Sequence, residues 1–276
     1  MTDPSEIAGF YDQYGEREWE RLDRDFHHRL EFEVTTDYLT DHLPETGHVL
    51  DVGGGGGRYA VWLAERGYDV TLVDVSERQV EIANEKAAEH GVTDRVETQQ
   101  GDVRALAFDD ARFDATLCLG GALSHVLDAS ERETAVAELH RVTRSDAPVF
   151  VSVMGLLASV TRMLRHAGTT EPDETELLPD LVATGDYDRE LVERYGRELS
   201  VQPMHLFRAD EFETLLANQL IVETLAALEG PFSQRRDQQD ALTATHRSAI
   251  RETLATLRED RSVVDHSAHM LAVCRT

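Results

Sequence analysis

The sequence of 276 residues has only two cysteines and a single lysine, Lys86. Cys118 lies in an apolar run and Cys274 lies two residues from the end, so we expect neither a disulfide framework nor a cysteine-based metal site. No stretch approaches the roughly 18 to 20 apolar residues that a membrane helix needs. The first twenty residues also lack the basic start and apolar run of a secretory signal. We therefore expect a soluble, cytoplasmic chain without a membrane partner.

Positive charge is scarce as well. The chain has 53 acidic and 27 basic residues, which gives a net charge of −26, and the excess is spread along its whole length. This composition resembles that of proteins from salt-loving organisms, because the Debye length falls to about 3 Å at 1 M salt and like charges then repel less. Nucleic-acid binding normally needs a basic stripe, and we see none. We expect no nucleic-acid partner.

Strand and helix patterns alternate between residues 47 and 154. Short β-rich runs predict strands at residues 48–52, 69–75, 95–99, 113–119 and 148–154. Helices are expected at residues 58–66, 76–90 and 130–144, the last two opened by capping boxes, Ser76 with Gln79 and Ser130 with Glu133. Parallel strands need such crossovers, so the pattern predicts a doubly wound parallel sheet with its ligand site at the carboxyl ends of the strands.

The alternation breaks after Met154 for about fifty residues. Helical stretches at 156–166 and 186–199 flank an acid-rich link at 169–180, which is typical of an inserted lid. A helix at 210–219, a strand at 221–228, a helical segment at 234–259 and a last strand at 269–274 follow. We expect one domain over 1–276, with an N-terminal helical cap at 1–46, a ligand-binding core at 47–154, a helical lid insert at 155–205, and the remainder of the core at 206–276.

Five glycines follow Asp51 directly after one expected strand and directly before a helix. Glycine is needed where backbone approaches a ligand closely or takes a positive φ, and the helix N-terminus offers free N–H groups. A dinucleotide site is one interpretation, because Gly55, Gly57 and Ala60 satisfy G-x-G-x-x-A. Asp51, however, would push a carboxylate towards a pyrophosphate, whereas it suits a ligand that carries positive charge.

The loop resembles the D/E-x-G-x-G-x-G motif of the class I S-adenosylmethionine (SAM)-dependent methyltransferases. The motif residues are matched by Asp51, Gly53, Gly55 and Gly57. The resemblance implies a Rossmann-like α/β fold with a mostly parallel seven-stranded sheet, an antiparallel last strand and SAM as cofactor. It further implies that Asp74 and the adjacent Val75 bind the ribose, that Asp102 and Val103 bind adenine, and that Leu119 and Gly120 touch the methionine end.

Aromatic and histidine residues outside this motif have two interpretations each. Tyr11 and Tyr14 resemble the N-terminal helix that covers SAM in many small-molecule methyltransferases, or they pack an aromatic stripe on the core. His125, after the fourth strand, is the candidate catalytic base, or it caps a turn. Arg162, Arg165 and His205 are candidates to line an acceptor pocket. The segment His27–Arg29 has no metal-ligand arrangement, so we expect it at the surface and expect no metal site.

The function implied by the resemblance is methyl transfer from SAM to nitrogen or oxygen of an unidentified small molecule, with S-adenosylhomocysteine (SAH) as product. The acceptor itself is left open. Two alternatives also remain open at this point: a noncatalytic SAM-binding protein, and an NAD-dependent oxidoreductase. A homodimer is a further possibility.

Overall fold

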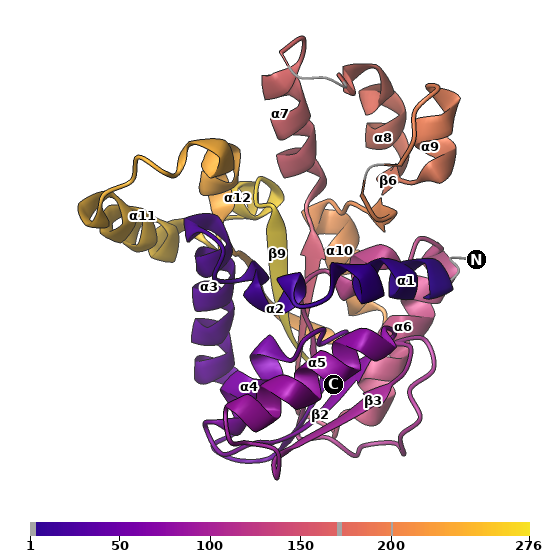
Figure 1. The fold of residues 1–276 in the computed structure, drawn as a ribbon, viewed down its shortest axis with the longest axis vertical. Coiled ribbons are helices and arrows are strands. Elements are labelled where there is room, and N and C mark those ends of the chain that lie inside the picture. Colours follow the sequence, from indigo (N-terminus) through magenta and orange to yellow (C-terminus); the bar gives the residue numbers. More distant parts are fainter. Residues whose placement is uncertain (1–3, 170–172, 200) are drawn as a thin grey trace.

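Seven strands form one sheet in a computed structural model that describes residues 4–169, 173–199 and 201–276, apart from the side chains of 236 and 237. The strand order is β3–β2–β1–β4–β5–β9–β8 (Figure 1). The strands are β1 (His48–Val52), β2 (Asp69–Asp74), β3 (Val96–Gln100), β4 (Ala115–Cys118), β5 (Pro148–Met154), β8 (Ile221–Ala227) and β9 (His269–Arg275). β1 to β5 pair in parallel, and β9 runs antiparallel to both β5 and β8. The expected Rossmann-like sheet with its antiparallel last strand is confirmed.

Helices cover both faces of this sheet. Because side chains alternate along a strand, Val49 of β1 packs in one core and Leu50 in the other. The core that contains Val49 includes α3 (Phe26–His42), α4 (Arg58–Ala64) and α5 (Glu77–Glu89). The core that contains Leu50 includes α6 (Ala129–Val142), α10 (Ala209–Ala217) and α12 (Arg261–Asp265). The capping residues predicted for α5 are present, since Ser76 accepts a hydrogen bond from the Gln79 N–H.

The N-terminal helices α1 (Pro4–Tyr14) and α2 (Arg17–Arg21) lie across the molecule next to the carboxyl ends of the parallel strands (Figure 1). Gln79 on α5 donates to the carbonyls of Tyr11 and Gly15, and the Ser76 hydroxyl donates to Asp12. These hydrogen bonds join residues more than sixty positions apart, so they hold the two N-terminal helices over the edge where the sequence places the ligand.

The segment between β5 and α10 builds a cluster with its own small core. It contains α7 (Leu156–His166), a 3-10 turn η2 (Thr175–Leu177), α8 (Leu178–Thr184), β6 (Asp186–Tyr187), α9 (Arg189–Arg194) and β7 (Met204–His205). The expected helix at 186–199 is wrong: Asp186 and Tyr187 pair with β7, and only 189–194 are helical. The expected link at 169–180 contains the start of α8, and residues 170–172 of it lie outside the described residues.

The expected helical segment at 234–259 is divided in two. A 3-10 segment, η3 (Gly230–Gln238), precedes α11 (Ala244–Leu257), and α12 follows after a short turn. The capping residue Thr243 starts α11 by accepting from the His246 N–H, which explains where the new helix begins. In the parts of the chain that the structure describes, every helix is too short or too polar to span a bilayer.

Candidate active site

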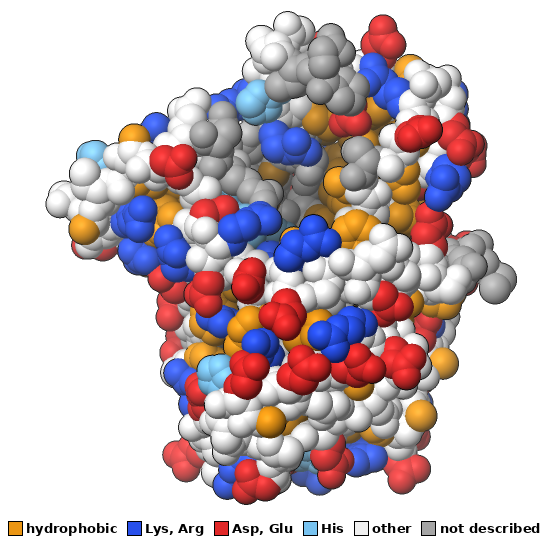
Figure 2. All heavy atoms as spheres, viewed as in Figure 1, with side chains coloured by type: hydrophobic (Ala, Val, Ile, Leu, Met, Phe, Trp, Pro, Cys, Tyr) orange, Lys and Arg blue, Asp and Glu red, His pale blue; other side chains and the backbone are white. Residues whose placement is uncertain are grey.

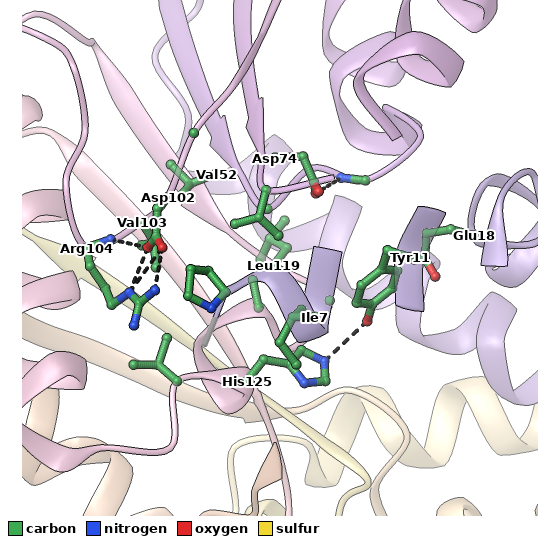
Figure 3. Close-up of a pocket in the computed structure, with 18 residues that line it drawn as sticks. Ile7, Tyr11, Glu18, Val52, Asp74, Asp102, Val103, Arg104, Leu119 and His125 are labelled. Atoms are coloured by element: carbon green, nitrogen blue, oxygen red, sulfur yellow. Dashed lines mark hydrogen bonds and ion pairs between the residues drawn. The ribbon is translucent and has the colours of Figure 1, made fainter. Parts of the chain in front are cut away.

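A pocket lies at the carboxyl ends of β1, β2, β3 and β4, under α1 (Figure 3). Nine of the residues predicted to bind cofactor line it, together with the predicted base: Tyr11, Gly53, Gly55, Asp74, Val75, Asp102, Val103, Leu119, Gly120 and His125. The topology therefore collects side chains from four separate βα connections and from the N-terminal helix into one cavity.

The glycine loop follows β1 closely and lacks room for side chains. Gly53 has a φ of +69°, and a Cβ there would lie 2.5 Å from the Ala122 Cβ. Gly55 also has a positive φ, and its N–H donates to Asp74 Oδ2 at 2.9 Å. Gly57 lies outside the pocket lining and is the left-handed N-cap residue of α4. The loop thus brings bare backbone to the pocket wall and starts a helix immediately behind it.

Asp74 is the buried acid of the pocket. Its two carboxylate oxygens accept from the backbone N–H groups of Gly55 and Ser76 at 2.9 Å each. Burial raises the pKa of Asp74 to about 6, although these two N–H groups oppose the shift. Each oxygen keeps a further lone pair, so the carboxylate can still accept from a diol in the pocket.

Asp51 lies outside the lining of the pocket. The alternation along β1 turns its side chain beneath the loop, where a Cβ on Gly54 would lie 2.7 Å from Asp51 Oδ2. Neither oxygen has a hydrogen-bond partner of normal geometry among the described residues. Burial and then the charge of Asp74 raise the pKa of Asp51 to about 7. Direct ligand contact by Asp51 stays a prediction.

Asp102 faces the pocket but is already paired. Arg104 donates to the Asp102 carboxylate from two guanidinium nitrogens, and its Nη2 lies 2.6 Å from Asp102 Oδ2 (Figure 3). Arg104 also forms an ion pair with Glu131. This pairing holds the pKa of Asp102 below its usual value despite partial burial. An adenine ring that binds here must share the Asp102 carboxylate with Arg104. The sequence interpretation did not include this pairing.

Tyr11 and His125 meet inside the pocket, with the Tyr11 hydroxyl 3.2 Å from His125 Nε2 (Figure 3). The other ring nitrogen of His125, Nδ1, lies 2.9 Å from the Pro203 carbonyl. A carbonyl only accepts, so Nδ1 carries the proton and Nε2 accepts from Tyr11. Burial lowers the pKa of His125, which favours this neutral form. Tyr14 lies outside the pocket lining and stacks on Phe10.

Sequence reasoning missed several residues of the pocket. Glu18 on α2 brings a third carboxylate to it, beside Asp74 and Asp102, and is ion-paired with Arg21 at 2.9 Å. No local motif marks Glu18, because only the folding of α2 over the loop places it there. The other unpredicted lining residues are Pro4, Ile7, Val52, Gly101, Arg104, Ala122 and Val126.

The expectation that His27 and His28 lie at the surface is wrong, since they are 1% and 3% exposed. Two groups have ligand atoms close enough for a metal ion: Asp25, His27 and His28; and Glu31, Glu229 and His269. Their own members pair with one another, as His28 does with Asp25 at 2.7 Å and His269 with Glu229 at 2.6 Å. Arg21 adds a 2.7 Å contact to Glu31. An internal ion pair therefore joins two members of each group.

His205, a candidate lining residue for an acceptor pocket, is buried elsewhere. Its ring nitrogens contact Asp186 and Glu211 at 2.7 Å each. Arg162 and Arg165, by contrast, do line a cavity, which adjoins the insert and shares no lining residue with the pocket under α1.

Comparison with known proteins finds a family match for part of the chain. Residues 49–146, which span β1 to the loop before β5, match the model of a family described as a methyltransferase domain. This part of the chain is therefore similar to a methyltransferase domain. The strand order β3–β2–β1–β4–β5–β9–β8 and the pocket at its carboxyl edge belong to this domain and its continuation.

Relatives of the methyltransferase domain differ widely. A ubiquinone biosynthesis O-methyltransferase of Azotobacter vinelandii is 32% identical over 156 residues, which cover 55% of this chain and 64% of that protein. The matched stretch covers 36% to 50% of four other curated relatives.

Solved structures share the fold. A SAM-dependent methyltransferase of Methanosarcina mazei is 19% identical with a TM-score of 0.59, covering 87% of this chain and 96% of that one. A geranyl diphosphate C-methyltransferase of Streptomyces coelicolor, solved with Mg²⁺, geranyl diphosphate and SAH, is 17% identical with a TM-score of 0.55, covering 90% and 81%. At these identities the likeness concerns the fold alone.

Proposed function

We propose that this chain transfers a methyl group from SAM to a small-molecule acceptor. The observation that carries the proposal is the buried Asp74 carboxylate, which faces the pocket beside a glycine loop without room for side chains. SAM, when bound, supplies a methyl group on a sulfonium, so the protein mainly has to bind and align the reactants. The methyltransferase relatives support this assignment.

The residues of the pocket divide into proposed roles by position. Asp74 and Val75 would hold the ribose, and Asp102, shared with Arg104, together with Val103 would hold adenine. Gly53, Gly55, Leu119 and Gly120 would contact the methionine portion, whose ammonium the carboxylate of Glu18 also suits. Tyr11 would cover the cofactor from α1. Asp51 and Gly57 would act from beneath the glycine loop. Asp51 would contribute its charge, and Gly57 would cap the helix α4.

The experiment is calorimetric titration of the chain with SAM, SAH and NAD at high salt. Replacing Asp74 with alanine removes charge-assisted hydrogen bonds, which should cost on the order of 1.5 to 3 kcal/mol, or about ten- to a hundredfold in SAM affinity. The matched control is Asp69→Ala, at the exposed start of the same strand, which should leave affinity unchanged. Unchanged SAM binding in Asp74→Ala, with the fold intact by circular dichroism, would remove the assignment.

The two alternatives give different results in the same titration. An NAD-dependent oxidoreductase would bind NAD and ignore SAM. A noncatalytic SAM-binding protein would bind SAM and release no SAH with any acceptor of a panel that includes amines, alcohols and phenols.

The environment of the chain is part of the proposal. The net charge of −26 supports a cytoplasm rich in salt and a metabolite rather than a nucleic acid as partner. Association into a homodimer remains a proposal that sedimentation of the purified chain would test.

A further inference from the structure

A second cavity of about 640 Å³ lies between α7, η3 and the segment that joins α2 to α3. Figure 2 shows the molecule hollowed below α7, with blue basic side chains around the hollow. Its charged lining residues are Arg24, Arg162, Arg165, His27, His166, His269 and a single acid, Asp25. The whole chain has about twice as many acidic as basic residues, whereas basic side chains outnumber acidic ones among the residues that line this cavity.

Two other cavities keep the acidic character of the chain. The charged residues of one, beside α9, are Glu6, Arg189, Glu193, Arg197 and Glu198. Those of the other, beside α10, are Arg132, Glu133, Asp210 and Glu211. The excess of arginine is thus a local property of the cavity at α7.

The helix α7 presents its polar face to this cavity. Ala158, Ser159, Arg162, Arg165 and His166 recur at intervals of three and four residues and all line it. Leu156 and Met163 belong to the core of the insert instead. Both arginines are exposed side chains that line the cavity from this helix.

Uncommitted hydrogen-bonding groups face the same space. Arg162 makes no hydrogen bond or ion pair with any residue that the structure describes. Both polar atoms of the Gln234 amide are buried and lack a partner within the described part of the chain. Buried polar atoms without partners are costly, which indicates that a ligand or water completes them.

Two other ionisable residues at the cavity, Asp25 and His269, pair with neighbouring side chains. Asp25 accepts from the backbone N–H and the ring of His28, and His269 pairs with Glu229 at 2.6 Å. Arg24 pairs with Asp25 as well. Arg162 therefore offers its positive charge to a ligand, and its planar guanidinium matches a carboxylate or phosphate.

The cavity adjoins the pocket under α1 at a pair of glycines, Gly120 and Gly121. A Cβ on Gly121 would lie 2.8 Å from the terminal methyl of Met154, which lines the basic cavity, while Gly120 lines the cofactor pocket. Met154, Ala158, Met204 and Leu206 form an apolar wall on this side. An acceptor in the cavity would place its apolar part against this wall, on the side of the cofactor.

We infer that this cavity is the acceptor site and that the acceptor is an amphiphilic small molecule with an anionic group, a carboxylate or a phosphate, held by Arg162 and Arg165. The catalytic part of this inference rests on the proposed function, but the anion site does not. The anion sits at α7 and the apolar part points to Met154, so the negative charge of the substrate lies away from the three carboxylates of the pocket under α1, Glu18, Asp74 and Asp102.

The test uses hexanoate, hexyl phosphate and the neutral isostere hexanamide as probes. Each is titrated calorimetrically into the full chain at one fixed KCl concentration, with and without SAH. We expect at least one anion to bind about tenfold or more tightly than hexanamide, because the charge-assisted contacts are lost in the amide. The tighter of the two anions identifies the group as carboxylate or phosphate.

Substitutions link the binding to the helix. Arg162→Ala and the double variant with Arg165→Ala should weaken anion binding about ten- to a hundredfold and leave SAH affinity within twofold. Arg194→Ala, an exposed arginine on α9 outside the cavity, is the control and should change neither.

Three results would overturn the inference: no anion binding, equal binding of hexanamide, or unchanged binding in the double variant. If SAH fails to bind while the anions bind with the expected dependence on Arg162, the proposed function fails and the anion site stands.

Discussion

The Tyr11 hydroxyl and the His125 ring occupy the part of the cofactor pocket that lies nearest to the insert, and their hydrogen bond determines what His125 can do. Because Pro203 fixes the proton on Nδ1, Nε2 is the basic atom, and Tyr11 occupies it. A proton taken from an acceptor would therefore pass either through the Tyr11 hydroxyl or to Nε2 after Tyr11 moves. We therefore propose that Tyr11 positions His125 in addition to its proposed role of covering the cofactor.

We predict that His125→Ala keeps SAM affinity but lowers turnover by roughly 10² to 10⁴ if the histidine is the general base. Burial lowers the pKa of His125, so the neutral base persists below the usual value of 6.5, and turnover of the native chain should stay level from pH 9 to about 6.5. Steady-state rates across pH 6 to 9 measure this.

The control for this substitution is His90→Ala, whose ring lies on the surface and pairs with Glu65. It should leave the rate and its pH profile unchanged. A normal rate in His125→Ala over the whole pH range would eliminate the base and leave alignment as the mechanism.

At the scale of elements, His205 joins the insert to the core. Its Nδ1 contacts Asp186 of β6 and its Nε2 contacts Glu211 of α10, while the ring is 2% exposed. Burial lowers the pKa of His205, but the hydrogen bonds to both carboxylates outweigh it and the net shift is upward. The pKa of Glu211 is lowered in return, chiefly by its bond to His205 against the effect of burial.

These shifts predict a pH window for stability. A raised histidine pKa contributes stability that is full below the unfolded value of 6.5 and is lost as pH rises through the folded pKa. A lowered glutamate pKa contributes above the unfolded value of 4.5 and is lost as pH falls through the folded pKa. His205→Gln should therefore cost most between about pH 4.5 and 6.5, on the order of 2 kcal/mol in the free energy of unfolding.

Urea unfolding of the native chain and of His205→Gln at pH 5, 6, 7 and 8 measures that difference. It should shrink towards pH 8. His90→Gln removes an exposed ion pair and should cost little at any of these values. If His205→Gln lowered the free energy of unfolding more at higher pH, the proposed pairing of a charged His205 with Asp186 and Glu211 would be contradicted.

At the scale of the whole molecule, the net charge of −26 is the feature that most affects stability in dilute buffer. Arginine supplies nearly all the positive charge and is drawn into ion pairs, such as Arg21 with Glu31 and Arg251 with Glu33, and into the basic cavity. Among the described residues the buried acids are Glu31, Asp51, Asp74 and Glu229, and the other carboxylates reach solvent, where they repel one another when little salt is present.

We predict that the melting temperature rises between 0.1 M and 2 M KCl, because screening relieves this repulsion. A gain of about 2 kcal/mol would correspond to roughly 4 to 8 °C for a domain of this size. Melts in 2 M sucrose, which does not screen charge, are the control. A flat or falling melting temperature in KCl would contradict adaptation to salt.

Most of the sheet and part of the pocket could be predicted from local pattern. Strand and helix periodicity, the cap at Ser76 and the glycines after Asp51 identified five strands and three helices, because backbone conformation and burial on two faces constrain each short segment. The predicted capping box at Ser130 was wrong: Asp128 caps α6 by accepting from the N–H groups of Ser130 and Glu131. The position of Asp74 and Asp102 in one pocket could be predicted as well, since the carboxyl ends of neighbouring parallel strands meet at one edge of the sheet.

Only the tertiary structure decided the rest. The sequence marks neither the covering of the pocket by Glu18, nor the pairing of Asp102 with Arg104, nor the burial of His27. These depend on segments that meet from across the chain: α2 over the glycine loop, and η3 and α7 around the basic cavity. Periodicity shows which face of a helix or strand is buried, but it does not show which other segment packs against that face. The chemistry of a site depends on that packing partner.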